Sequence, residues 1–162
     1  MDEALKAKIL KVLGSQHLMT LATLRPDGYP QATTVNYISD GFTIYFAADA
    51  ASQKVGNIKL NSKVAAAIAS EADNFYRLAG VSLSGNAKRL MEPERADEVL
   101  TELFRRLPQS KRFVPDDRRQ LAVLAIAPVA ISLVDYASGY GTSYVIELES
   151  DASTTAPERS SH

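Results

Sequence analysis

Two tight turns near the start of the chain constrain its fold most strongly. Arg25-Pro26-Asp27-Gly28 and Ser39-Asp40-Gly41 contain the residues that β-turns require, because proline presets φ and glycine tolerates positive φ. Residues 18–24, 29–38 and 42–46 flank these turns and have the composition of strands. Three strands joined by short turns predict an antiparallel meander, because parallel strands need long crossover connections.

The remaining segments predict a small, mostly β domain. We expect helices over residues 3–13 (with Gly14 as C-cap), 53–60 and 93–107, and strands over 63–70, 76–90, 120–134 (interrupted at Pro128) and 142–148. Small antiparallel sheets usually close to hide their edges, which predicts an antiparallel β-barrel of about six to seven strands with flanking helices. The domain is expected to span residues 1–148. Residues 149–162 lack large apolar side chains and are expected to form a mobile tail.

The scarcity of reactive side chains limits the chemistry that the chain can perform alone. It has no cysteine, which excludes disulfides, thiolate nucleophiles and cysteine-ligated metals. Its two histidines, His17 and His162, disfavour a histidine relay or a two-histidine metal site, so no metal site is predicted. A net charge of −1 gives no electrostatic case for nucleic acid. We therefore expect a bound cofactor to supply the chemistry.

The sequence is typical of a cytoplasmic protein. The first residues, Met1 to Lys6, carry acids and no apolar segment of the kind found in secretory signals. The longest apolar run, 121–134, has about 14 residues, and a membrane-spanning helix needs about 20. The lack of cysteine also suits a reducing cytosol.

Ala51-Ser52-Gln53-Lys54 is the clearest candidate binding segment. It follows a predicted strand and begins a predicted helix, where free backbone N–H groups and partial positive charge favour an anion. The Ser52 hydroxyl and the Lys54 ammonium would strengthen such a site. The alternative interpretation is a simple N-cap by Ser52 with a surface lysine.

A second candidate is the polar strand that covers residues 32–37. Thr34 and Asn36 share one face, and Thr33, Val35 and Tyr37 share the other. Polar groups on a central strand need hydrogen-bond partners, which either water or a flat heteroaromatic ligand could supply.

A third segment, Asp135 to Gly141, is rich in small residues and could allow close approach of a ligand or a second subunit. Tyr136 and Tyr140 in this segment form an aromatic set with Tyr144, which follows it. This set and the apolar run over 121–134 exceed what one small core needs, which predicts a homodimer. A mobile loop with ordinary packing is the alternative.

The order of these segments resembles the FMN-binding split-barrel family related to pyridoxamine 5′-phosphate oxidase. The resemblance covers roughly residues 5–90 and includes the strand Met19 to Thr23, the turn Arg25 to Pro30, and the segments Ser52 to Ile58 and Asn61 to Val64. Asp135 to Gly141 resembles a further segment of some members.

The resemblance implies a homodimer with two FMN sites at its interface. By position, it assigns FMN contacts to Thr33, Thr34, Val35, Asn36, Tyr45, Phe46, Ser52, Gln53 and Lys54, with the phosphate at the last three. Gln53 stands where the family has arginine. The chain also lacks tryptophan and the C-terminal substrate-binding segment of the oxidase, so the oxidase activity itself is not implied.

These observations predict an FMN-dependent oxidoreductase of unknown substrate. The alternatives are a flavin-binding or electron-transfer module without a substrate, and a protein that binds a deazaflavin or haem in the same barrel. Haem is disfavoured because His17 is the one internal histidine. No catalytic residue is assigned, although Tyr140 is a candidate proton donor.

Overall fold

A computed structural model describes residues 2–70, 73–139 and 143–148. Its α-helices are α1 (Glu3–Ser15), α2 (Gln53–Leu60) and α3 (Pro93–Arg106), and its short 3-10 helices are η1 (Phe75–Arg77), η2 (Pro108–Phe113), η3 (Arg118–Gln120) and η4 (Tyr136–Ser138). Its strands are β1 (Leu18–Leu24), β2 (Pro30–Asn36), β3 (Ile38–Asp40), β4 (Thr43–Asp49), β5 (Lys63–Ala69), β6 (Ala79–Arg89), β7 (Leu121–Asp135) and β8 (Ser143–Glu147). The predicted mobile tail lies outside these residues.

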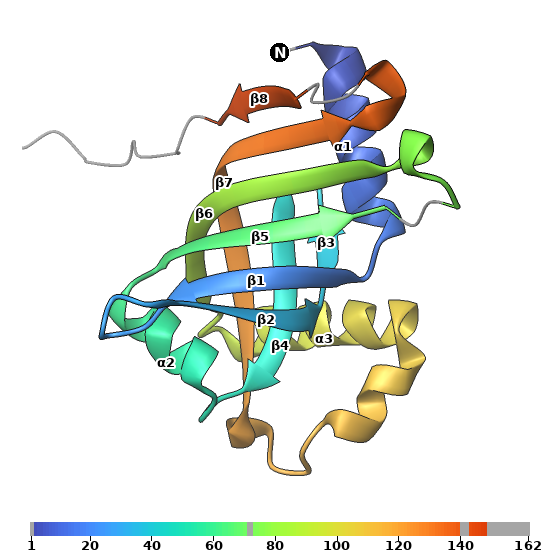
Figure 1. The fold of residues 1–162 in the computed structure, drawn as a ribbon. Helices are drawn as coiled ribbons and strands as arrows, with labels where there is room; N and C mark the ends of the chain where they lie inside the picture. The colour runs from blue at the N-terminus through green and yellow to red at the C-terminus, as the bar shows by residue number, and fades with distance from the viewer. Residues whose placement is uncertain (1, 71–72, 140–142, 149–162) are drawn as a thin grey trace, which may run out of the picture.

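The strands form one antiparallel sheet that curls into a half-barrel (Figure 1). Its order is β2-β1-β5-β6-β7-β4-β3, with β8 paired to β7, so the described residues hold eight strands rather than six or seven. The mostly β fold is confirmed, but the predicted three-stranded meander is wrong. β2 pairs with β1, whereas β4 pairs with β3 and with the distant β7.

The strand predicted over residues 29–38 is broken at Tyr37. This side chain is fully buried, and its hydroxyl donates a 2.8 Å hydrogen bond to the Leu13 carbonyl in α1. The Tyr37 N–H donates to the His17 carbonyl at 2.9 Å, directly after Leu18 and Asn36, the last pair in the register of β1 and β2. This anchoring turns the chain away from β1 and into the β3–β4 hairpin.

β7 connects the two halves of the sheet. One part of it lies beside β4, and the other lies between β6 and β8 (Figure 1). The register between β6 and β7 shifts between Ser84 and Gly85, where Gly85 pairs with Pro128, and such a shift marks a β-bulge. Part of the apolar run lies in the protein's own core, since Ala122 to Ile126 are all buried. Val129, by contrast, is 37% exposed, and Val134 lines an open hollow.

The helices follow their predictions except at some ends. α1 begins after Asp2, whose carboxylate accepts from the Ala4 N–H at 2.9 Å, but it continues through Gly14, so the predicted glycine cap is wrong. α2 has its predicted bounds, and α3 begins at Pro93 as expected. The strand predicted from Tyr76 begins later because η1 occupies its first residues.

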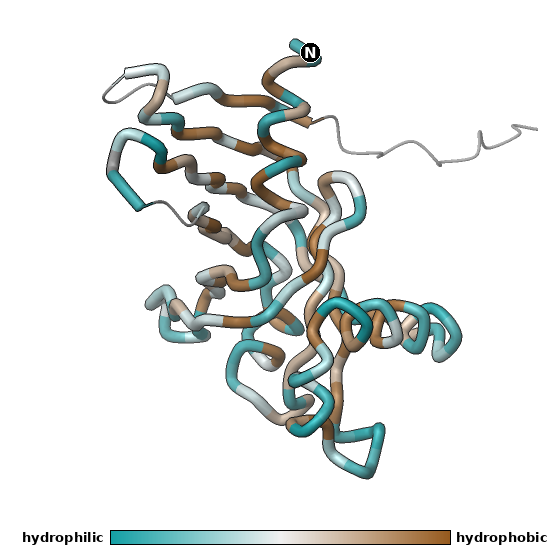
Figure 2. Tube along the Cα trace, turned by 90° about the vertical axis from the view of Figure 1, so that its right-hand side faces the viewer, coloured by the Kyte–Doolittle hydropathy of each residue, from teal (hydrophilic) through white to brown (hydrophobic). Residues whose placement is uncertain are grey.

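The main core lies between α1 and the inner face of the curled sheet, and a smaller cluster packs α3 against β3, β4 and β7. Figure 2 shows hydrophobic stretches along the strands and largely hydrophilic turns. Among the described residues, no helix has the length and apolar character needed to cross a membrane.

Candidate functional site

A groove of about 310 Å³ lies where β2, β4 and the start of α2 face α3 and η2. Its sheet side is formed by Thr34, Val35, Asn36, Ala47, Ala48 and Asp49, with Ser52 and Lys54 at one end. The facing wall is largely apolar and includes Leu103, Phe104, Phe113, Val114 and Leu121. The groove therefore combines an apolar space with a polar, cationic end, which suits a ligand that has a flat ring and an anionic group.

The structure brings two of the predicted segments together in this groove. Thr34, Val35 and Asn36 line it from β2, and Ser52 and Lys54 line it from the start of α2. The strand and the anion segment were separate predictions from the sequence, and the fold places them against one cavity.

Two hydroxyls from these segments are buried without a hydrogen-bond partner among the described residues. They are Ser52 Oγ at the start of α2, which lines the groove, and Thr33 Oγ1 on β2, which is not among the lining residues. A buried hydroxyl without a partner costs about 1–3 kcal/mol, so such atoms usually bind water or a ligand. Ser52 occupies the N-cap position of α2, but its side chain makes no capping bond, so the predicted side-chain cap is wrong.

The electrostatics at the start of α2 favour an anion. The first turn of α2 contains no acidic residue, and Lys54 makes no ion pair with any described residue. The Asp49 carboxylate is the one acidic side chain among the described lining residues, and the 2.8 Å hydrogen bond that it accepts from the Ala51 N–H partly offsets its charge. Together with Ser52, this helix terminus offers a hydroxyl, an ammonium group and free backbone N–H groups to one ligand.

A network of side-chain amides fixes α2 against β1 and β2. Asn57 Nδ2 donates to Thr23 Oγ1 at 3.0 Å and to Gln31 Oε1 at 3.2 Å, and Asn57 and Thr23 are both almost fully buried. Gln31 Nε2 also donates to Gln53 Oε1 at 3.2 Å. The exposed Gln53 thus holds the start of α2 on β2. Asn57 and Gln31 were missed in the sequence, although a polar residue on the apolar side of a short helix is a signal for such a network.

Tyr45 and Phe46, the other predicted site residues, lie elsewhere. Phe46 is fully buried in the main core, and the Tyr45 hydroxyl accepts a 3.0 Å hydrogen bond from Arg95, whose guanidinium lies 5.3 Å from the Tyr45 ring centre. The following residues of β4, Ala47 and Ala48, line the groove instead. Their small side chains leave space for a ligand, and this is the sequence signal that would have identified them.

The third predicted segment forms a capped turn. The Asp135 carboxylate accepts from the Ala137 N–H at 3.1 Å and thereby caps η4. Tyr136 is half-buried and Tyr144 is 41% exposed, whereas Tyr140 lies outside the described residues. Asp135 to Ser138 and Tyr144 lie outside the lining of the groove.

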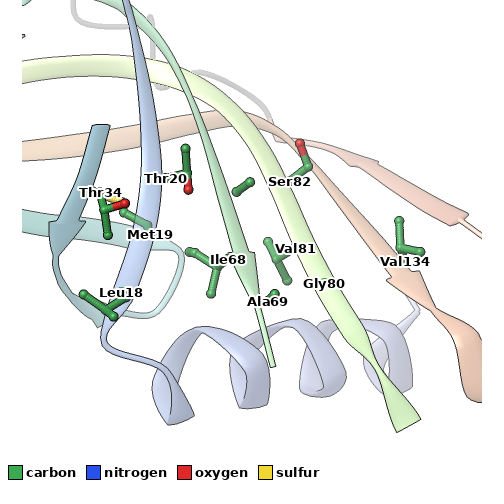
Figure 3. A pocket seen from close by; sticks show the side chains of 11 residues that line it. Leu18, Met19, Thr20, Thr34, Ile68, Ala69, Gly80, Val81, Ser82 and Val134 are labelled. Atoms are coloured by element: carbon green, nitrogen blue, oxygen red, sulfur yellow. The ribbon is translucent and has the colours of Figure 1, made fainter. Parts of the chain in front are cut away.

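A further hollow, of about 450 Å³, opens on the outer side of β1, β5 and β6. Figure 3 shows the mostly short side chains that surround it, among them Thr20, Ala69 and Ser82. All its lining residues are uncharged. Among the residues that the structure describes, no three or more His, Asp or Glu side chains are grouped so that they could hold a metal ion.

Comparison with solved structures shows a widely shared fold. A haem-binding protein from Mycobacterium smegmatis is 20% identical with a TM-score of 0.73, covering 91% of this chain and 58% of its own. A conserved hypothetical protein from Mycobacterium tuberculosis is 25% identical with a TM-score of 0.71, covering 91% of this chain and 93% of its own. An FAD-binding protein from Mesorhizobium loti is 16% identical with a TM-score of 0.66, covering 78% of this chain and 91% of its own.

The chain has no match among curated protein sequences. Residues 5–135, however, match the sequence model of the pyridoxamine 5′-phosphate oxidase family. This match includes both halves of the curled sheet and every residue at the cationic end of the groove. The chain therefore belongs to the pyridoxamine 5′-phosphate oxidase family.

Proposed function

We propose that the groove binds FMN and that the protein is an FMN-dependent oxidoreductase. The observation that carries this proposal is the buried Ser52 Oγ, which has no hydrogen-bond partner among the described residues and lines the groove together with the cation Lys54. Thr33 Oγ1, which is also unpartnered, lies on β2 next to the lining residue Thr34. A ligand with hydroxyl groups and a phosphate would satisfy these groups together. Membership of the family supports a flavin as that ligand.

Different residues would contact the phosphate, the polar chain and the ring of FMN. Ser52, Lys54 and the first N–H groups of α2 would hold the phosphate through charge-assisted hydrogen bonds. Thr33 and Asn36 would meet the polar chain and ring edge. Val35 and the apolar wall opposite would exclude water from the ring. FMN supplies hydride or electron transfer when it is bound, and the protein binds and orients it.

An adjoining hollow supports an enzyme rather than a simple flavin carrier. This hollow, of about 240 Å³, shares Asp49, Phe113, Val114 and Leu121 with the groove and continues toward Arg112. An enzyme needs room for a second molecule beside its cofactor. The same space would also fit the longer tail of a deazaflavin, which stays the alternative cofactor.

Haem is a weaker candidate for the groove. The described residues that line it include no histidine, methionine or tyrosine that could serve as an axial ligand. His17 lies outside the lining, exposed just after α1.

We also propose that the protein acts in the cytoplasm as a homodimer, with the outer face of β1, β5 and β6 covered by a second copy. The support is the uncharged lining of the open hollow on this face, together with Leu18, which is 57% exposed beside it (Figure 3). Sedimentation velocity should give a dimer. Ala67→Glu, which places a charge on this face, should give a monomer, and the substitution Lys59→Glu on the exposed last turn of α2 should not.

The FMN proposal is tested by titrating the purified protein with FMN. We expect the flavin fluorescence to be quenched and its visible absorption to shift at micromolar protein. If FMN gives neither change while a deazaflavin or haemin binds saturably, FMN is not the cofactor.

A further inference from the structure

A second polar cavity, of about 360 Å³, lies between α1 and the ends of β5, β6 and β7. Lys8 and Lys11 contribute to it from one face of α1, and Arg77 of η1 and Asp135 at the end of β7 also line it. It shares no lining residue with the FMN groove. A ligand bound here would therefore be independent of the flavin.

The one acidic group of this cavity is already engaged. The Asp135 carboxylate accepts from Lys8 Nζ at 3.0 Å and from Ser138 Oγ at 3.1 Å, in addition to capping η4. The Lys8 ammonium lowers the pKa of Asp135, so the carboxylate stays ionised and keeps Lys8 at the wall. Lys8 and Asp135 neutralise each other, and this pair leaves two other cations in the cavity.

Lys11 and Arg77 make no ion pair with any described residue. Both are exposed and line the same cavity from different elements. Two uncompensated cations that line one space repel each other, and an anion between them offsets this repulsion with two attractions. Arginine also offers the planar pair of donors that matches phosphate oxygens.

The remaining walls favour an organic molecule rather than a bare ion. Val12 and Leu133 give the cavity an apolar side. Ser70 Oγ accepts a 2.9 Å hydrogen bond from the Ala79 N–H, so its own hydroxyl proton is available to a ligand oxygen. Cations, a hydroxyl donor and an apolar wall together suit a small carbon body that carries a doubly charged group.

We propose that this cavity binds a small phosphate monoester, with its phosphate between Lys11 and Arg77 and its carbon part against Val12 and Leu133. Such a ligand would bridge α1 and η1. Because it would bind the folded state, it would also stabilise the fold as its concentration rises above its Kd.

The test titrates the full chain with glycerol 3-phosphate as the probe. Binding is monitored by calorimetry and by amide chemical shifts. We expect saturable binding, with shifts in residues 8–15 and 77–79, whether or not FMN is already bound. Glycerol should not bind. Lys11→Ala and Arg77→Ala should each weaken binding roughly tenfold or more, because each removes a charge-assisted bond.

Lys88→Ala is the matched control, since Lys88 is exposed on β6 and lies outside the cavity. It should bind the probe as the native protein does. The proposal is wrong if the probe does not bind at millimolar concentration, or if both cavity variants bind it normally. It is also wrong if Lys54→Ala or bound FMN abolishes binding, because the phosphate would then occupy the start of α2.

Discussion

Replacing Lys54 by alanine should weaken FMN binding far more than riboflavin binding. Lys54 is half-buried and is the one cation among the described residues that line the groove. At 4 Å, an effective dielectric constant of 20 gives a Coulomb attraction of about 4 kcal/mol. Partial exposure reduces this value, and hydrogen bonds to charged groups contribute about 1.5–3 kcal/mol. The expected loss in FMN affinity is therefore about 10-fold to 150-fold.

Riboflavin separates the effect on the phosphate from an effect on the ring. It has the same ring and hydroxyl chain as FMN but no phosphate, so Lys54→Ala should change its Kd by less than about threefold, which is under 1 kcal/mol. Fluorescence quenching measures both affinities in one assay. The preference of the native protein for FMN should also decline with added salt, because salt screens a partly exposed charge.

Lys59→Ala is the control variant. Lys59 lies in the last turn of the same helix and is exposed outside the groove. This variant should keep the native affinity for both ligands. If Lys54→Ala weakens FMN and riboflavin equally, Lys54 acts on the fold or on the ring, and the phosphate assignment is refuted.

Four further variants test the fold and the site. In Gly85→Ala, the new Cβ would lie 2.5 Å from a backbone oxygen of β7, so we expect the free energy of unfolding in urea to fall by about 1–3 kcal/mol. Gly14→Ala, which has free space for the new Cβ in α1, should stabilise the protein. Thr33→Val removes an unpartnered buried hydroxyl, so the flavin-free protein should unfold at higher urea while FMN binds more weakly; unchanged FMN affinity would exclude Thr33 from the site. The hydrogen bond from Lys8 lowers the folded-state pKa of Asp135, so this pair stabilises the fold above about pH 4 and the stability is lost as the pH falls through the folded-state pKa. Asp135→Asn should lower stability at pH 7 and flatten this acid dependence, and an unchanged acid profile would contradict the assignment.

Local signals predicted the strands well, but not their partners. The turn that contains Gly41 does form a hairpin, with φ +57° at this glycine. Nothing in the sequence near β4, however, indicates that Ala47 pairs with Val123, because that contact depends on how the whole sheet closes. The break between β2 and β3 likewise depends on a contact between distant parts of the chain, the hydrogen bond from the Tyr37 hydroxyl to the Leu13 carbonyl.

In the candidate site, too, local sequence predicts some residues, whereas others are known only from the tertiary structure. Ser52 and Lys54 were recognisable because a strand, a hydroxyl residue and a helix follow one another within a few residues. On β4, Ala47 and Ala48 line the groove and the predicted Tyr45 and Phe46 do not, since strand alternation points Phe46 into the core. The wall that includes Phe104 comes from a distant helix, so only the tertiary structure reveals it.

Mapping FMN on the protein by amide chemical shifts tests the central claim most directly. With one equivalent of FMN, we predict that the largest shifts fall in residues 33–36 and 52–54, the two segments that meet in the groove. The amide chemical shifts of residues 8–15 in α1 should stay unchanged under the same conditions. An absence of shifts, or shifts confined to α1 or to the outer face of β5 and β6, would contradict the proposed flavin site.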